Sequence, residues 1–180
     1  MQYLVLLRGI NVGGNNIIKM ADLRACLEKH GCSEVKTYIQ SGNVIINTKE
    51  KDITKETARL EKLLSKEFNY QSTLVLLTKT QMQNAVDSAP KGFGKEPENY
   101  RYNVIFLKEP LKSSKALEEL SLNPGVDFVV AGSGLLYHSY PIAKASKSHI
   151  SRISKLPLYK SITIRNWNTT TKLLALLNES

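Results

Sequence analysis

The chain has 180 residues, of which 42% are hydrophobic and 23% charged, and it carries a formal net charge of +9. This composition is typical of a folded globular protein and excludes an intrinsically disordered one. No run approaches the roughly 18 apolar residues of a membrane-spanning helix, and the basic lead and cleavage site of a signal peptide are missing. We therefore expect a cytoplasmic protein with no membrane partner.

The first half of the chain predicts the element order strand, helix, strand, strand, helix, strand. An apolar run over residues 3–7 predicts the first strand, and Gly31 follows a helix that begins near Met20. Ser41-Gly42-Asn43 is typical of a tight turn between two strands. Apolar spacing predicts a second helix around residues 60–68. The further strands are predicted over residues 35–40, 44–47 and 74–77.

The second half repeats this order after a short helix over residues 81–88 and a Gly/Pro-rich connector over 90–99. Two βαββαβ units predict an α+β fold made of two ferredoxin-like plait subdomains. We expect a first subdomain over residues 1–80, a helix and connector over 81–102, and a second subdomain with an added C-terminal helix over 103–180. Its strands are predicted over residues 104–107, 127–131, 135–140 and 161–165, and its helices over 114–120, 143–156 and 169–177.

A Gly/Asn-rich loop over residues 8–16 follows the first strand and precedes a helix, an arrangement that presents backbone N–H groups to an anion. In a plait sheet of strand order 4-1-3-2, this loop and the turn at residues 41–43 lie at the same edge. The loop lacks the ending of a phosphate-binding P-loop and the spacing of a dinucleotide-binding motif. A purely structural turn is therefore an equally good interpretation. The candidate anion-binding residues here are Arg8, Asn11, Gly13, Gly14, Asn15, Ser41 and Asn43.

A second arginine closes a predicted strand near the C-terminus. Arg165 and Asn166 precede the last helix, whose positive end and capping residues could also face an anion, so both join the anion-binding candidates. Trp167 could stack on a base or ring. We favour a buried anchor for it, because a single Trp is usually mostly buried.

Residues 128–178 contain no Asp or Glu. On a helix over residues 143–156, four basic side chains share one face with Ser148 and Ser151, opposite three aliphatic residues. Such a face could follow the phosphates of a nucleic acid, and an ordinary solvated helix face is the alternative. A membrane-surface helix is disfavoured, because the apolar side has no Trp or Phe. The candidate nucleic-acid-binding residues are Lys144, Lys147, Arg152 and Lys155.

Other kinds of site find little support. Cys26 and Cys32 are expected to be free thiols, buried or half-buried, rather than a redox pair. The histidines are scattered without the spacing of zinc ligands, so we expect no metal and no cofactor. No catalytic motif appears, and the catalytic residues of any enzyme stay unassigned. An RNA-recognition motif is not expected, because the run over residues 42–46 carries no Phe or Tyr, and Tyr3 and Tyr38 alone do not replace them.

Several stretches of the chain resemble one bacterial family. They read LLRGINVGG over residues 6–14, KMADLR over 19–24, YIQSGNV over 38–44 and TIRNWNT over 163–169. In these the chain is similar to the family known as domain of unknown function 1697, over essentially its whole length. The resemblance implies two ferredoxin-like subdomains and no activity. Ile18-Lys19 stands where the family pattern often has a Pro before the Met.

The sequence thus points first to a non-catalytic protein that binds nucleic acid or another polyanion. An enzyme or sensor for a small phosphorylated or carboxylated metabolite, held at the 8–16 loop, is one alternative. A protein-interaction module is another, because plaits often pair through their sheets, and the fold alone does not decide among these functions. A closed pocket between Arg8 and Asn43 would favour binding of a small metabolite, whereas an open basic surface would favour binding of a polyanion. The oligomeric state is left open.

Overall fold

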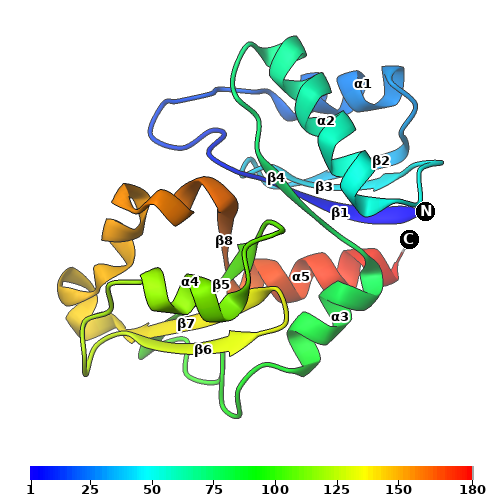
Figure 1. Ribbon diagram of the computed structural model, residues 1–180. Helices are drawn as coiled ribbons and strands as arrows, with labels where there is room; N and C mark the ends of the chain where they lie inside the picture. The colour runs from blue at the N-terminus through cyan, green and yellow to red at the C-terminus, as the bar shows by residue number, and fades with distance from the viewer. Residues whose placement is uncertain (180) are drawn as a thin grey trace. The chain divides into compact units, whose positions relative to one another are not determined.

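The computed structural model describes residues 1–179 and contains two compact units, each built on a four-stranded antiparallel sheet (Figure 1). The first unit comprises residues 1–82 and the last residues of the chain from 175, and the second comprises residues 83–174. The strand orders are β2-β3-β1-β4 and β6-β7-β5-β8. Both orders are that of the ferredoxin-like plait, so the predicted fold class is confirmed.

In the first unit, β1 is one of the two inner strands, and it pairs with β3 and β4 on its two sides. Asp52 caps α2, because its side chain accepts hydrogen bonds from the N–H groups of Thr54 and Lys55. The elements of the unit are β1 (Gln2–Leu7), α1 (Met20–Lys29), β2 (Ser33–Tyr38), β3 (Asn43–Asn47), α2 (Ile53–Phe68) and β4 (Leu74–Leu77).

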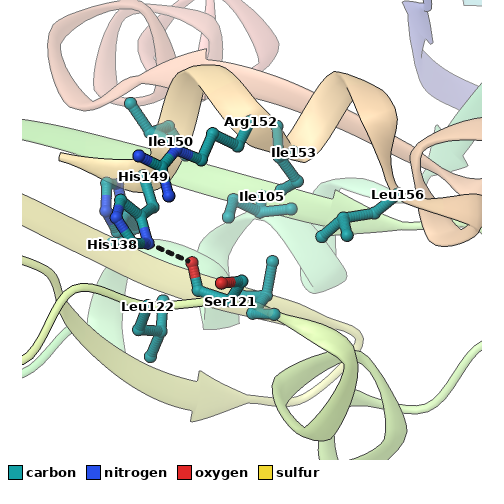
Figure 2. A pocket seen from close by; sticks show the side chains of 10 residues that line it. Ile105, Ser121, Leu122, His138, His149, Ile150, Arg152, Ile153 and Leu156 are labelled. Carbon is teal, nitrogen blue, oxygen red and sulfur yellow. Dashed lines mark hydrogen bonds between the residues drawn. The ribbon is translucent and has the colours of Figure 1, made fainter.

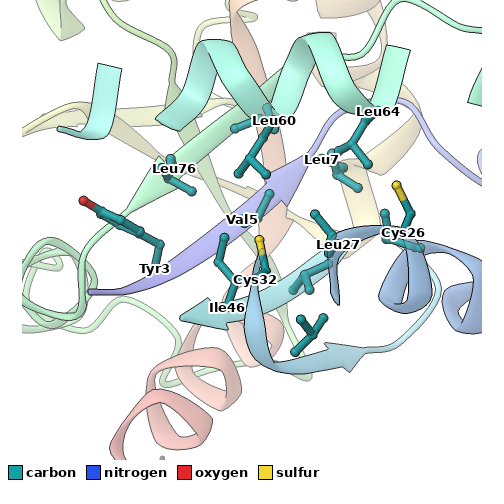
Figure 3. Close-up of a cluster of buried hydrophobic side chains, with 14 of the residues drawn as sticks. Tyr3, Val5, Leu7, Cys26, Leu27, Cys32, Ile46, Leu60, Leu64 and Leu76 are labelled. Carbon is teal, nitrogen blue, oxygen red and sulfur yellow. The ribbon is translucent and has the colours of Figure 1, made fainter. Parts of the chain in front are cut away.

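The core of the first unit lies between one face of its sheet and helices α1 and α2. Alternate residues of β1, among them Val5 and Leu7, contact Leu27 of α1 and Leu60 of α2 in this cluster (Figure 3). Cys26 and Cys32 belong to the same core and are free thiols, as predicted. Burial raises the pKa of both thiols, which keeps them protonated and unreactive at neutral pH.

The second unit repeats the arrangement around β5, which pairs with β7 and β8. Its core packs Ile105 and Leu136 of the sheet against Ala116 of α4 and Ile153. Helix α3 (Lys79–Asp87) leads into it. The other elements are β5 (Tyr100–Leu107), α4 (Ser113–Glu119), β6 (Phe128–Gly132), β7 (Leu135–Pro141), the 3-10 helices η1 (Ile142–Lys147), η2 (His149–Lys155) and η3 (Pro157–Ser161), β8 (Ile162–Asn166) and α5 (Trp167–Asn178).

The predicted α-helix over residues 143–156 is wrong, because this part of the chain forms two 3-10 helices joined at Ser148. The backbone of Ser148 is extended, with φ −64° and ψ 137°, and its side chain caps η2 by accepting from the N–H of Ile150. Leu156, which precedes Pro157, is extended too, as a residue before proline usually is. The apolar side of the predicted helix nevertheless faces the core, where Ile153 is buried.

Several other elements begin earlier than predicted, among them α2, which begins at Ile53 rather than near residue 60. Strand β5 begins at Tyr100 rather than at residue 104, and α5 begins at Trp167 rather than at residue 169. In the part of the chain that the structure describes, no helix is both long and apolar enough to span a membrane.

Candidate functional site

The 8–16 loop and the turn at residues 41–43 are neighbours, as the predicted strand order requires. The N–H of Leu7 donates to the carbonyl of Gly42 at 2.8 Å. Gly42 has φ +74°, and a Cβ there would lie 2.7 Å from the Cβ of Leu7. Only glycine therefore allows this close approach.

The polar side chains of this edge mainly hold the loop in shape. The Asn11 amide donates to the carbonyls of Ile18 and Gln40 at 2.9 and 2.8 Å, and its oxygen accepts from the N–H of Ile18 at 2.8 Å. Asn43 is fully buried, and its amide donates to the Tyr38 carbonyl and the Ser41 hydroxyl. Asn11 and Asn43 thus direct these hydrogen bonds to the chain itself.

The tip of the loop is open to solvent. Gly13 and Gly14, with φ of +59° and +78°, form a tight turn that the N–H of Asn15 closes by donating to the Val12 carbonyl at 3.1 Å. Gly13, Gly14 and Asn15 are exposed, whereas Arg8 at the base of the loop is half-buried.

Arg165 and Asn166 are also placed by the fold. The guanidinium of Arg165 is buried and donates to the Thr163 hydroxyl at 2.7 Å and the Ile164 carbonyl at 2.9 Å. Burial lowers its pKa to about 10, so the side chain stays charged at neutral pH. The Asn166 oxygen accepts from the N–H of Thr169 at 2.7 Å and caps α5.

Trp167 is half-buried and packs inside the second unit. Its ring meets that of Phe93 edge to face, with the ring centroids 5.1 Å apart. Gly94 lies against the indole so closely that a Cβ there would be 2.2 Å from its Nε1. This packing fits the anchor interpretation of Trp167.

A buried carboxylate that the sequence analysis did not single out organises the second unit. One oxygen of Asp127 accepts from the Ser148 hydroxyl at 2.5 Å and lies 3.1 Å from Nε2 of His138. The other accepts from the N–H groups of Asn123 and His149, each at 2.9 Å. Burial raises the pKa of Asp127, but these hydrogen bonds outweigh it and lower the pKa to about 2.

His138 completes this cluster on the core side of β7. Burial lowers its pKa, and the hydrogen bond with Asp127 opposes that shift. Its Nδ1 lies 3.5 Å from the amide nitrogen of Asn103, which fits a neutral ring that accepts there and donates from Nε2 to Asp127. The cluster is closed on itself and satisfies its own polar groups, so it acts as a structural centre.

Asp127 fixes the segment that carries the predicted nucleic-acid-binding residues. It binds Ser148 and His149 at the junction of η1 and η2, and the Asn123 amide donates to the carbonyl of Lys147 at 2.8 Å. Ser148 is therefore buried, and the expectation that it shares the basic face is wrong. We call residues 142–160 the basic segment. Its five cations are all exposed: Lys144, Lys147, Arg152, Lys155 and Lys160.

A small cavity lies beneath η2, between the basic segment and the sheet. Figure 2 shows His138, His149, Arg152 and Ile153 around it, and Nδ1 of His149 lies 3.2 Å from the Ser121 carbonyl. The cavity volume is about 10 Å³, which is room for about one water molecule. It is a packing defect of the core and too small for a ligand.

A larger hollow, the sheet-face groove, lies on the face of the second sheet that is turned away from Ile105 and Leu136. Its volume is about 380 Å³, within the range of small-molecule sites. The groove is not evident from the sequence, because the aromatic residues that line it come from the unpredicted start of β5, from the connector and from two other strands. They are Phe93, Tyr100, Tyr102, Phe128 and Tyr137.

Comparison with other proteins identifies relatives but no activity. A conserved bacterial protein of known structure from Streptococcus pneumoniae is similar over 98% of both chains, with 26% sequence identity and a TM-score of 0.84. None of the curated proteins compared with the chain matches it. The model of the family described as "Protein of unknown function (DUF1697)" matches residues 1–137, including the 8–16 loop. The chain therefore belongs to this family of proteins of unknown function.

Proposed function

We propose that the protein binds nucleic acid or a similar polyanion through the basic segment. The observation that carries this proposal is the exposure of all five cations of the segment together with the complete absence of Asp and Glu from residues 128–178. Exposed Lys and Arg side chains that neutralise the phosphates of a nucleic acid release the cations condensed on it, and this release drives binding through a gain in entropy.

The surroundings of the cations support binding to an external anion. Within residues 1–179, none of Lys144, Lys147, Arg152, Lys155 and Lys160 forms an ion pair with a carboxylate. By contrast, Lys115 on the neighbouring helix α4 pairs with Glu118 and Glu119. The cations of the basic segment therefore keep their charge available to a partner.

The rigidity of the segment is a second support. Asp127 ties the middle of the segment to the sheet through Ser148 and His149, and the N–H of Ile142 donates to the Asn99 carbonyl at 2.8 Å at its start. Cations on a fixed backbone lose less conformational entropy when they bind than cations on a mobile tail. Binding to a phosphate backbone is therefore less costly here.

The test is a fluorescence-anisotropy titration with labelled single- and double-stranded RNA and DNA. We compare the wild type with a Lys147→Glu/Arg152→Glu/Lys155→Glu variant. The matched control, Lys49→Glu/Lys62→Glu/Lys66→Glu, changes three exposed cations of the first unit and lowers the net charge of +9 by the same six units. Micromolar binding that the first variant loses and the control keeps supports the proposal. Equal losses of affinity in both variants would show that binding depends only on the net charge of the protein, and this would contradict the proposal.

A protein-interaction module is the second candidate, and one observation favours it. Val12, Ile17 and Ile39 are 62%, 76% and 50% exposed, and the Asn11 hydrogen bond to Gln40 joins the two turns that carry them. Sedimentation of the wild type and of an Ile17→Asp variant at rising concentration tests self-association through this patch. If the wild type and the variant were both monomers at every concentration, self-association through this patch would be excluded.

The metabolite alternative has less support. A small anion at the 8–16 loop would have to use the exposed N–H groups near Gly13 and Gly14 together with Arg8, because Asn11 and Asn43 are engaged in holding the loop. Phosphate or sulfate that protects the wild type against thermal unfolding, but not the Arg8→Ala variant, would support binding of a metabolite at this loop.

A further inference from the structure

The strand register of the second sheet brings aromatic side chains to one face. Tyr102 of β5 and Phe128 of β6 both pair with Ser139 of β7, and directly paired residues point to the same face of a sheet. Val130 pairs with Tyr137 in the next row on that face. Three aromatic side chains and Val130 thus share this face with Ser139.

This face is accessible at the edge formed by β6. Phe128 and Val130 are each 49% exposed, although they belong to a strand whose opposite face packs on the core through Val129. Large apolar side chains exposed on a strand are a recognised mark of binding surfaces. The floor, by contrast, is fixed, because Tyr137 is buried and its hydroxyl donates to the Ala85 carbonyl at 2.7 Å.

Phe93, from the connector before β5, forms the wall of the sheet-face groove. Its ring packs edge to face on Tyr102 and Tyr137, with centroid distances of 4.9 and 5.4 Å. Tyr100 lies beside Tyr102 at 6.0 Å. Rings that are already packed against one another present their remaining faces at little cost in conformational entropy, which suits the binding of another flat ring.

The basic segment begins at the same end of the sheet. Pro141, the last residue of β7, pairs with Tyr100, and the N–H of Ile142 donates to the carbonyl of Asn99. The first of the five cations, Lys144, therefore follows closely after this end of the groove in the chain, whereas Ile153 packs the middle of the basic segment on the opposite face of the sheet. A ligand that offers both flat rings and phosphates is complementary to this combination.

We propose that the sheet-face groove stacks an unpaired base of single-stranded nucleic acid, while phosphates of the same strand beyond the end of the sheet contact the basic segment from Lys144 onwards. The phosphate half of this inference rests on the proposed function. Aromatic side chains on the central strands of a four-stranded sheet suit this mode of recognition, because every base has a π-face that stacks on them. Ser139 adds one hydroxyl that can bond the edge of the base.

The experiment compares two strands of equal length and charge, an oligodeoxynucleotide and its abasic counterpart, in Phe128→Ala and wild-type protein. The proposal predicts that the wild type binds the base-bearing strand more tightly. It also predicts that Phe128→Ala loses roughly tenfold in affinity for that strand and nothing for the abasic strand. Phe128→Tyr keeps an aromatic face at the same position, is expected to keep the affinity of the wild type and serves as the control. Circular dichroism and thermal melts verify that both variants fold.

The outcomes separate this inference from the proposed function. Equal affinity of the wild type for the two strands, unchanged in Phe128→Ala, overturns base stacking and leaves polyanion binding in place. No binding of either strand at low salt overturns both. Binding of a Tyr-containing peptide that depends on Phe128, without any preference for base-bearing strands, assigns the groove to a protein partner and also overturns the proposal.

Discussion

The Ser148 hydroxyl donates a hydrogen bond of 2.5 Å to the carboxylate of Asp127. This contact decides the local structure of the basic segment. It draws the backbone of Ser148 out of helical geometry, separates η1 from η2, and leaves Lys147 and Arg152 exposed on either side of the junction. A buried carboxylate in the preceding loop thereby sets the display of cations on which the proposed function depends.

Asp127 should make the free energy of unfolding depend on pH in the acidic range. Its folded pKa of about 2 lies below the ordinary value of 3.8, so the ionised form stabilises the fold above pH ~4, and this contribution is lost as the pH falls towards 2. The difference is worth about 2 kcal/mol. We expect Asp127→Asn to lose about 2 kcal/mol at pH 7, about half of that at pH 3 and much less at pH 2, as measured by urea unfolding.

The control for Asp127 is Asp87→Asn, which changes an exposed carboxylate that accepts from the side chain of Gln83. It should change the free energy of unfolding by less than about 0.5 kcal/mol. A loss in Asp127→Asn no larger than that would show that the carboxylate does not organise this unit.

His138 should remain neutral in the folded protein below the pH at which an exposed histidine is protonated. Burial lowers its pKa from 6.5, so protonation favours the unfolded chain, and the stabilising effect of the neutral ring is lost as the pH falls below about 6.5. An NMR titration of the His138 ring should give a pKa below 6.5. A value above 6.5 would mean that the ion pair with Asp127 outweighs burial.

Gly94 and Gly92 offer a matched pair for testing the packing of Trp167. Both have positive φ, +80° and +86°, but a Cβ would overlap the indole only at Gly94, since nothing lies within 4 Å of a Cβ at Gly92. We expect Gly94→Ala to lose about 2 kcal/mol more than Gly92→Ala. Quenching of Trp167 fluorescence by acrylamide should rise only in Gly94→Ala. Equal effects of the two variants would attribute the cost to backbone strain alone.

Asn11 and Asn15 separate the structural role of the 8–16 loop from a binding role. Asn11→Ala removes three hydrogen bonds that tie the loop to Ile18 and Gln40 and should destabilise the protein by about 1–3 kcal/mol. Asn15 is exposed at the tip, so Asn15→Ala should cost less than about 0.5 kcal/mol. Chemical denaturation measures both. If Asn11→Ala left stability unchanged, the amide would be free for a ligand after all.

Much of the fold can be predicted from the sequence, because the periodicities that mark strands and helices are local. The turn residues Gly31 and Ser41-Gly42-Asn43 stand where the structure has its turns, and the order of elements then restricts the sheet to the plait topology. The same reasoning brings the 8–16 loop next to the turn at residues 41–43, as the hydrogen bond from Leu7 to Gly42 confirms.

The parts that were missed depend on contacts between distant residues. The helical periodicity of residues 143–156 is real, but the competing hydrogen bonds come from Asp127, which sequence analysis assigned to a strand. The sheet-face groove combines Phe93, Tyr102 and Phe128 from three separate segments, and its aromatic face follows only from the strand register. Because Tyr100 and Tyr102 alternate with polar residues, the predicted strand could have been extended to residue 100, and this would have indicated part of the aromatic face.

The most direct test of the central claim is the salt dependence of binding to a short single-stranded oligonucleotide. For single strands, the logarithm of the binding constant falls with the logarithm of salt concentration with a slope of about −0.7 for each phosphate contacted. If the basic segment makes these contacts, Lys147→Ala/Arg152→Ala/Lys155→Ala should make the slope less steep by about 2, while Lys49→Ala/Lys62→Ala/Lys66→Ala leaves it unchanged. An identical slope in the wild type and both variants would contradict the account.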